Sequence, residues 1–485
     1  MAAVESAAEI VLIVGLLVLA ALSLNLLLLT VARLWPFQQE GAPLAADATA
    51  TSTPDVLIQL PLYNEAELVE RVLTAVAALD WPREHLAVQV LDDSTDGSLA
   101  LSRAAVERWK GAGLRVELRH RSQRTAFKAG ALAAGLERCE APFVAIFDAD
   151  FIPPADFLRR TVPRLLGEPR LALVQARWTH LNADESLLTR IQARLLDGHF
   201  RVEQVARARL GLPVPFNGTC GIWRRAAIDD AGGWQGDTLT EDLDLSLRAH
   251  LKGWRAAYLP DLTVPGSLPG SPRAWRAQQF RWTKGFVQCF VKLLPRVWGS
   301  RLLPWWQKVA VSLQLGQPLA FLVGLLCLLL GLPYVAGEAT AGPVLAVVGI
   351  TASVLGFLGT GGFLAAAVEP PSRIRALPEI LAALVLTSGL LLSNARAAFE
   401  ALVGRRSEFV RTPKVPTAMR PTTRGLPPYG LPELAVGVGL LGFGLAEEPG
   451  TVPYLALVIG GLVGFGLMQI LDGRRMERVR MRSSR

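Results

Sequence analysis

The chain has 485 residues, enough for one sizeable soluble domain together with a membrane part. Apolar residues make up 51% of it and the mean hydropathy is +0.33, which is high for a soluble protein, and the excess lies at the two ends. The net charge of +8 gathers beside apolar segments instead of forming a nucleic-acid footprint, so no nucleic-acid partner is expected. The four cysteines lack the spacing of a metal site.

The N-terminal part begins with an apolar segment, residues 10–33, that is long enough to cross a bilayer. No basic region precedes it, and it is longer than the apolar core of a signal peptide, which favours a retained transmembrane helix. We therefore expect residues 1–40 to form an N-terminal membrane helix.

The central residues 50–300 have the pattern of an α/β domain. The predicted strands are 55–61, 86–91, 114–119 and 143–147, and the predicted helices between them are 65–79, 98–111 and 126–138. This alternation predicts a Rossmann-like, mostly parallel sheet with helices on both faces, where ligands bind beyond the carboxyl ends of the strands. Neither GxGxxG nor GxxxxGK[ST] occurs, which argues against a dinucleotide oxidoreductase and a P-loop ATPase.

Acidic residues follow the second and fourth predicted strands. Asp92 and Asp93 open the sequence DDSTDG, which could equally be an Asx turn that caps the next helix. Asp148 and Asp150 come directly after an apolar strand, and two carboxylates so close repel each other unless a cation lies between them. Because hard oxygen ligands suit Mg²⁺ or Mn²⁺, we expect one of these ions to bridge a diphosphate there.

Two motifs farther along the chain carry polar side chains of chemical interest. The sequence TED precedes a predicted helix and could be a plain cap, or Asp242 could take a proton from a hydroxyl group. In the sequence QQFRW, Gln278, Arg281 and Trp282 are spaced i, i+3 and i+4 and so share one face of a helix. Arg281 could bind phosphate oxygens while the indole binds a sugar face, or the pair could be an interfacial membrane anchor.

Two amphipathic segments, 186–210 and 272–290, mix apolar and basic residues at helical spacing. They are typical of helices that lie on the cytoplasmic face of a bilayer, although an ordinary pair of core-facing helices would show the same pattern.

The C-terminal residues 301–485 are expected to form a transmembrane region. Its apolar stretches are 307–333, 344–369, 376–404, 432–447 and 453–471. Basic residues flank segment 376–404 on both sides and its second half is polar, so we expect an interfacial or re-entrant helix there. Loops 334–343 and 446–452 carry no Lys or Arg and should face outward by the positive-inside rule. About five spans follow, with the N-terminus outside and the central domain cytosolic.

In their order along the chain, these motifs resemble the processive, membrane-integrated family 2 glycosyltransferases of the cellulose synthase-like superfamily. The resemblance covers about residues 54–285. The sequences LPLYNE, VLDDSTDGS, DADFIP and LTEDLDLSLRAHLKGW are closest to the glucomannan and mannan synthase branch.

The resemblance implies roles on the donor side of a site. Asp92 and Asp93 would hold the base and ribose of a nucleotide, with Asp93 also belonging to the catalytic group. Lys128 would approach the diphosphate. Asp148 and Asp150 would hold the sugar nucleotide and the metal ion, Mg²⁺ or Mn²⁺.

The resemblance also implies the reacting groups and the acceptor side. Asp242 would deprotonate the acceptor hydroxyl and Arg281 would stabilise the departing diphosphate, as inverting transfer requires. The acceptor end would contact four side chains, Gln278, Trp282, Glu241 and Cys220. The last of these belongs to segment 216–221, which resembles an acceptor-lining loop.

A weaker match lies in the segment 405–420, which resembles the gating loop of this family. Phe409, Thr412 and Lys414 fit the pattern, whereas Arg411 stands where a valine is usual. A basic cytoplasmic loop that follows the positive-inside rule would look the same.

The expected function is a polymerising hexosyltransferase that extends a β-1,4-linked mannan, glucan or glucomannan and secretes it across a bacterial inner membrane. GDP-mannose and UDP-glucose are the candidate donors, the growing polysaccharide is the acceptor, and no export partner is identified. A single transfer to a lipid, as in ceramide glucosyltransferase, is the alternative. A non-catalytic sugar-nucleotide sensor is a third hypothesis, but it predicts a missing catalytic carboxylate, whereas Asp242 is present.

Overall fold

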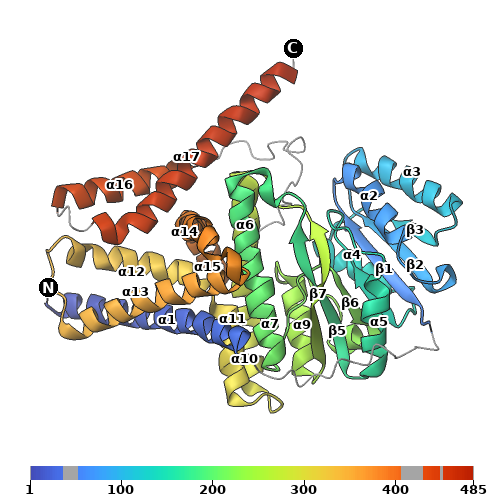
Figure 1. Ribbon diagram of the computed structural model, residues 1–485, viewed down its shortest axis with the longest axis horizontal. Coiled ribbons are helices and arrows are strands. Elements are labelled where there is room, and N and C mark those ends of the chain that lie inside the picture. Colours follow the sequence, from blue (N-terminus) through green and yellow to red (C-terminus); the bar gives the residue numbers. More distant parts are fainter. Residues whose placement is uncertain (1, 36–52, 406–429, 448–451, 484–485) are drawn as a thin grey trace.

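Two parts of the protein lie side by side, an α/β domain and a bundle of long helices (Figure 1). The computed structural model describes residues 2–35, 53–405, 430–447 and 452–483. Except for residue 405, the gate-like segment with Phe409, Thr412 and Lys414 lies outside these ranges.

The α/β domain is built on a seven-stranded sheet of order β3-β2-β1-β4-β6-β5-β7. The strands are β1 (Val56–Leu62), β2 (Leu86–Asp92), β3 (Val116–Arg119), β4 (Phe143–Ile146), β5 (Leu171–His180), β6 (Gly221–Arg224) and β7 (Arg255–Gly266). Strands β1 to β4 pair in parallel, as do β5 and β7, while β6 runs antiparallel to both of its neighbours. The predicted α/β fold with a mostly parallel sheet is confirmed, and the antiparallel strand lies beyond the part in which strands were assigned from the sequence.

Helices cover both faces of this sheet because successive strand residues point to opposite sides. In β1, Val56, Ile58 and Leu60 belong to one apolar core and Leu57 to the other. The first core is closed by α2 (Ala66–Ala77), α3 (Ser98–Gly111) and α5 (Phe157–Gly167), and the second by α4 (Phe127–Leu136), α8 (Arg225–Asp230) and α9 (Glu241–Leu251). Short 3-10 turns are η1 (Arg83–His85), η2 (Ala183–Glu185) and η4 (Pro370–Ser372).

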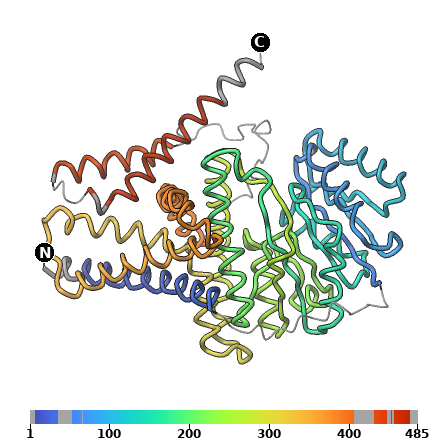
Figure 2. Tube along the Cα trace, viewed as in Figure 1, coloured from blue at the N-terminus to red at the C-terminus, as the bar shows by residue number. Residues whose placement is uncertain are grey.

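Long helices form the second part and the border between the two parts. At the border lie α6 (Leu187–Asp197), the π-helical turn η3 (Gly198–Glu203), α7 (Gln204–Arg209) and α10 (Pro272–Gly299). The bundle consists of α1 (Ala2–Leu34), α11 (Trp305–Gly316), α12 (Leu319–Val335), α13 (Pro343–Ala366), α14 (Arg373–Ser388), α15 (Leu391–Leu402), α16 (Leu431–Glu447) and α17 (Val452–Ser483). The start of α1 and the α12–α13 connection lie at the end of the bundle that is distant from the sheet (Figure 2).

Three helices in the described ranges are long and apolar enough to cross a membrane, namely Ala7–Leu34, Pro343–Ala366 and Leu455–Arg475. Two bent pairs, α11 with α12 and α14 with α15, would raise the number of spans to as many as five. The composition of these helices is that of a membrane protein. Helix α16 has 17 residues, which is short for a span.

Three segments that read as single apolar or amphipathic stretches in the sequence contain a bend or a helix distortion in the structure. The chain bends by 68° between α11 and α12 and by 52° between α14 and α15, and η3 interrupts the segment 186–210. The polar second half of segment 376–404 is α15, where Asn394 and Glu400 are buried against protein. Its polarity is therefore explained by protein contacts, whatever its position relative to a membrane.

The bend after α14 packs closely against α17. A Cβ atom on Gly389 would lie 2.6 Å from the carbonyl oxygen of Gly461, and the hydroxyl of Ser388 donates a hydrogen bond to the carbonyl of Leu457 at 2.7 Å. The two backbones therefore touch at this crossing, as small residues permit in helix packing.

Candidate active site

A cavity of about 440 Å³ lies beyond the carboxyl ends of β1, β2 and β4, where a parallel sheet is expected to bind its ligand. Its other walls come from α6, α9, α10 and the end of α14. Nine of the side chains selected from the sequence line it, namely Asp93, Lys128, Asp148, Asp150, Glu241, Asp242, Gln278, Arg281 and Trp282.

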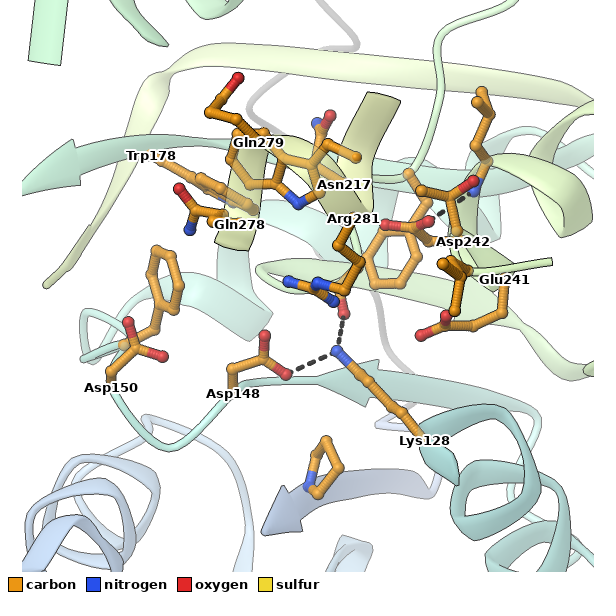
Figure 3. A pocket seen from close by; sticks show the side chains of 18 of the residues that line it. Lys128, Asp148, Asp150, Trp178, Asn217, Glu241, Asp242, Gln278, Gln279 and Arg281 are labelled. Carbon is orange, nitrogen blue, oxygen red and sulfur yellow. Dashed lines mark hydrogen bonds and ion pairs between the residues drawn. The ribbon is translucent and has the colours of Figure 1, made fainter. Parts of the chain in front are cut away.

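The end of β4 brings Asp148 and Asp150 to the cavity. Nζ of Lys128 donates hydrogen bonds to Oδ1 of Asp148 at 2.6 Å and to the carbonyl of Gly218 at 2.8 Å (Figure 3). Burial alone would lower the pKa of Lys128, but Asp148 and the nearby acids outweigh it and raise that pKa. Lys128 therefore stays charged in the wall of the cavity.

The residues at this end of the cavity fit a divalent ion that is shared with a phosphate group. The described part of the chain has no cluster of three His, Cys, Asp or Glu side chains able to hold a metal. One oxygen of Asp148 is engaged by Lys128, and Asp150 lines the same end of the cavity. Mg²⁺ and Mn²⁺ suit such oxygen ligands, and Mg²⁺ is commonly held by one or two carboxylates together with substrate phosphates.

Helix α9 begins at Glu241 and carries Asp242 into the cavity. Burial and then the neighbouring Glu241 raise the pKa of Asp242 to about 7, against the opposing effects of a hydrogen bond from the N–H of Leu243 and the charges of Lys128 and Arg281. A carboxylate with a pKa near 7 suits a general base. The acids lie in the first turn of a helix and also face the cavity, so the cap and the base interpretations are compatible.

The motif on α10 presents its polar face to the same cavity. Gln278, Arg281 and Trp282 all line it, as their helical spacing predicts. Arg281 lies between Asp148 on one side and Glu241 and Asp242 on the other (Figure 3). Burial lowers the pKa of Arg281 and these three acids oppose that effect. A cation in this place can offset negative charge that develops on a leaving group.

Only one of the two aspartates after β2 reaches the cavity. Asp93 lines it and forms a two-pronged ion pair with Arg121, whose Nε lies 3.0 Å from Oδ1. Asp92 is fully buried and accepts a hydrogen bond from the N–H of Ser94 at 2.8 Å, which is an Asx turn. The expectation that Asp92 holds the nucleotide is therefore wrong for its side chain, because adjacent residues of an extended chain point to opposite sides.

The loop after residue 215 meets the cavity through Phe216, Asn217 and Gly218 instead of Cys220. Cys220 is fully buried in the first core of the sheet, with φ +60°, and burial raises the pKa of its thiol. The expected acceptor contact of the Cys220 side chain is therefore wrong. Gly218 has φ +82°, and a Cβ atom there would lie 2.8 Å from Oδ2 of Asp242.

Comparison with known proteins agrees with this geometry. Residues 54–285 match the family described as "Glycosyltransferase like family 2". Residues 54–285 are therefore similar to family 2 glycosyltransferase domains. The predicted resemblance to the glucomannan and mannan synthase branch is thereby confirmed at the level of family, since curated relatives of that branch are 42–45% identical over about half of the chain.

The chain is 45% identical over 268 residues to glucomannan 4-beta-mannosyltransferase 2 of Arabidopsis thaliana, across 54% of this chain and 50% of that protein. It is 44% identical over 273 residues to the probable glucomannan 4-beta-mannosyltransferase 9 of Oryza sativa subsp. japonica, across 56% and 52% of the two proteins. The chain spans about half the length of the curated relatives it matches.

Among solved structures, the fold is similar to that of the mannosyltransferase PcManGT from Pyrobaculum calidifontis in complex with GDP-Man and Mn²⁺. The TM-score is 0.56 at 24% identity, and the match covers 81% of this chain and all of that one. This likeness establishes a shared fold.

Several residues of the segment 54–285 line the cavity without having been selected from the sequence. His199 and Asn217 lie on its wall, and the Arg124 guanidinium lies over the ring of Tyr63, 3.4 Å from its centroid. Asn217 belongs to segment 216–221, for which the resemblance implied an acceptor-lining loop, and Tyr63 belongs to the sequence LPLYNE. No motif marks His199 or Arg124. His199 sits on the π-helical turn, which interrupts a segment with an ordinary helical pattern, so only the structure shows where its ring points.

Proposed function

We propose that this protein is an inverting hexosyltransferase that lengthens a β-1,4-linked mannan or glucomannan from a nucleotide sugar. The observation that carries the proposal is the position of Asp242, a half-buried carboxylate with a pKa of about 7, across the cavity from Asp148 and Asp150 with Arg281 between them. The similarity to plant proteins named glucomannan 4-beta-mannosyltransferases supports it. GDP-mannose is our first candidate donor, because the solved mannosyltransferase of similar fold is in complex with it, and UDP-glucose is the second.

In the proposed reaction, Asp242 accepts the proton of the acceptor hydroxyl while that oxygen attacks the anomeric carbon of the donor. The bond from this carbon to the diphosphate breaks, and Arg281 offsets the negative charge that the diphosphate gains. Asp150 and Asp148 would hold Mg²⁺ or Mn²⁺, which would neutralise the diphosphate further. The Trp282 indole lines the cavity where the acceptor sugar would lie, and Gln278 would contact the same sugar.

The cavity also reaches the helical bundle, and a polymer remains our proposal over a single transfer to a lipid. Thr387 and Leu390, at the bend between α14 and α15, line the same cavity as Arg281. An acceptor that occupies the cavity therefore extends toward the bundle of apolar helices. We propose a multi-pass membrane protein with about five spans and a cytosolic catalytic domain. A bacterial inner membrane remains our expectation, although the relatives reported above are plant proteins.

The deciding experiment incubates inverted membrane vesicles with radiolabelled GDP-mannose or UDP-glucose and digests the product with linkage-specific glycanases. A β-mannanase-sensitive polymer supports the proposal, whereas label that extracts only with lipid supports the single-transfer alternative. Asp242→Asn should abolish transfer but still bind the donor. Polymer formation by Asp242→Asn would exclude Asp242 as the base.

A further inference from the structure

The amide side chain of Asn217 is fixed on one side by a histidine. Nε2 of His199 lies 2.9 Å from Oδ1 of Asn217, and Nδ1 of the same ring lies 2.8 Å from Oε2 of Glu203. The Gln204 amide also lies 3.3 Å from Nε2. His199 and Glu203 belong to the π-helical turn η3, a type of helix distortion that is common at functional sites.

The partners of His199 define which way the Asn217 amide faces. Burial opposes a charged imidazole, but the Glu203 carboxylate and the hydrogen bonds to Glu203 and Asn217 raise the pKa of His199 above its ordinary value. A protonated ring donates from both nitrogens, to the carboxylate on one side and to the amide oxygen on the other. The amide nitrogen of Asn217 is then turned away from the histidine.

The nitrogen of this amide, Nδ2 of Asn217, is unusual in its hydrogen bonding. Nδ2 of Asn217 is buried and has no hydrogen-bond partner in the described part of the chain. Buried donors are nearly always paired, so an unpaired one in the wall of a cavity indicates a missing ligand atom. The backbone does not leave the side chain free to relax, because the N–H of Asn217 donates to Oε1 of Gln175 at 3.1 Å.

The position of Asn217 identifies which part of a ligand it would meet. The next residue, Gly218, approaches Asp242 so closely that a Cβ atom would lie 2.8 Å from Oδ2. Asn217 lines the same cavity as Gln278 and Gln279 (Figure 3). The sugar whose hydroxyl reaches Asp242 therefore passes beside the Asn217 amide.

We propose that Nδ2 of Asn217 donates a hydrogen bond to a hydroxyl or ring oxygen of the acceptor-end sugar, and that His199 and Glu203 position this donor. Asn217 contacts the substrate, whereas His199 acts through Asn217 as a positioning residue. This inference rests on the proposed function and adds a specificity-determining contact to it.

The first test separates acceptor binding from donor use. The purified full-length protein in detergent is assayed for transfer from GDP-mannose, with UDP-glucose as the second donor, to β-1,4-mannotetraose, and for hydrolysis of the donor without acceptor. Asn217→Asp keeps the shape of the side chain but replaces the NH₂ donor with an acceptor, and Asn217→Leu removes both polar atoms. We expect the acceptor KM to rise about tenfold in both, as loss of one buried hydrogen bond implies, while donor hydrolysis changes less than about twofold.

The second test asks whether His199 acts through Asn217. His199→Leu should raise the acceptor KM as Asn217→Leu does, and His199→Gln, which retains an N–H donor, should restore part of the loss. Because the residues act in series, the double variant should be no worse than Asn217→Leu alone. His85→Leu is the matched control. His85 lies on the turn η1, and its Nδ1 atom is 2.7 Å from Oδ1 of Asp55, so it forms a similar pair. The acceptor KM of the His85→Leu variant should not change.

The outcomes are distinguishable. An unchanged acceptor KM in Asn217→Asp, with wild-type transfer intact, overturns this inference alone. Additive effects of His199→Leu and Asn217→Leu overturn the positioning role of His199. A wild-type protein that uses neither donor overturns the proposed function and this inference with it.

Discussion

Nζ of Lys284 lies 2.8 Å from Oε2 of Glu400, and both side chains are buried. Lys284 follows Arg281 and Trp282 within one turn of α10. Glu400 lies on α15, the helix that begins after the bend at the cavity. Glu400 also accepts a hydrogen bond from Nε of Arg396 at 2.8 Å. This ion pair therefore fixes α10, which carries the proposed phosphate and acceptor contacts, to α15, which follows the bend.

The pair predicts unequal effects of its two neutral variants. Lys284→Met leaves Glu400 with Arg396, whereas Glu400→Gln removes the carboxylate that compensates the buried charge of Lys284. We expect Glu400→Gln to destabilise the protein by about 3 kcal/mol and Lys284→Met by less. Thermal unfolding in detergent measures the order, with Arg396→Met as the control at an exposed position. Equal losses would contradict the asymmetry.

The raised pKa of Asp242 predicts the pH profile of transfer. A general base must be deprotonated, so kcat/KM should fall below pH about 7, the pKa of Asp242 in the ligand-free protein, and level off above it. Glu241 contributes to raising that pKa, so Glu241→Gln should move the midpoint to lower pH. Rates measured from pH 5 to 9 at subsaturating substrate test both statements. A midpoint that moves upward in Glu241→Gln would exclude this assignment.

Gly218 predicts a steric effect at the reacting carboxylate. In Gly218→Ala the new Cβ atom would lie 2.8 Å from Oδ2 of Asp242 and 3.6 Å from Nζ of Lys128, so we expect kcat to fall by about a hundredfold, as for a misplaced catalytic group. Gly211→Ala is the matched control. Gly211 also has a positive φ, +63°, but no atom lies within 4 Å of its Cβ position. Equal kcat values in the two variants would show that backbone strain alone explains any loss.

Trp282 predicts a separation of polymer synthesis from donor hydrolysis. Its indole lines the cavity on the same helical face as Gln278, where the acceptor would lie. Trp282→Ala should therefore reduce polymer synthesis much more than hydrolysis of the donor. Product length by gel filtration and release of the nucleotide diphosphate measure the two rates, and an equal loss in both would argue against an acceptor contact.

The two aspartates after β4 predict a metal requirement. EDTA should stop transfer, and Mg²⁺ or Mn²⁺ should restore it. Asp150→Asn should raise the metal concentration needed for half-maximal activity, whereas Asp148→Asn should in addition break the ion pair with Lys128. Titration of each variant with Mn²⁺ gives these values. Full activity in EDTA would refute the assignment of both residues.

Much of this site was predictable because residue spacing within one strand or one helix determines which side chains face the same way. Asp148 and Asp150 reach the cavity since they follow the carboxyl end of a strand, and Gln278, Arg281 and Trp282 do so since they share a helical face. Cys220 was assigned wrongly because a left-handed residue, φ +60°, redirects its side chain into the core.

Bends and distortions were the features that the sequence did not reveal. Apolar patterns continue through the 68° and 52° bends, so hydropathy alone does not locate them. The same holds for the π-helical turn that places His199 beside Asn217, because one extra residue in a turn leaves the helical pattern on either side intact.

The backbone contact between Gly389 and Gly461 ties α17 to the part of the chain that borders the cavity. Thr387 and Leu390 flank this crossing and also line the cavity, although none of the described side chains of α17 is part of the lining. A methyl group at either glycine would separate the helices and shift that wall. Variants designed to accept a wider or narrower product should therefore first change Gly389 or Gly461, which lie outside the cavity lining.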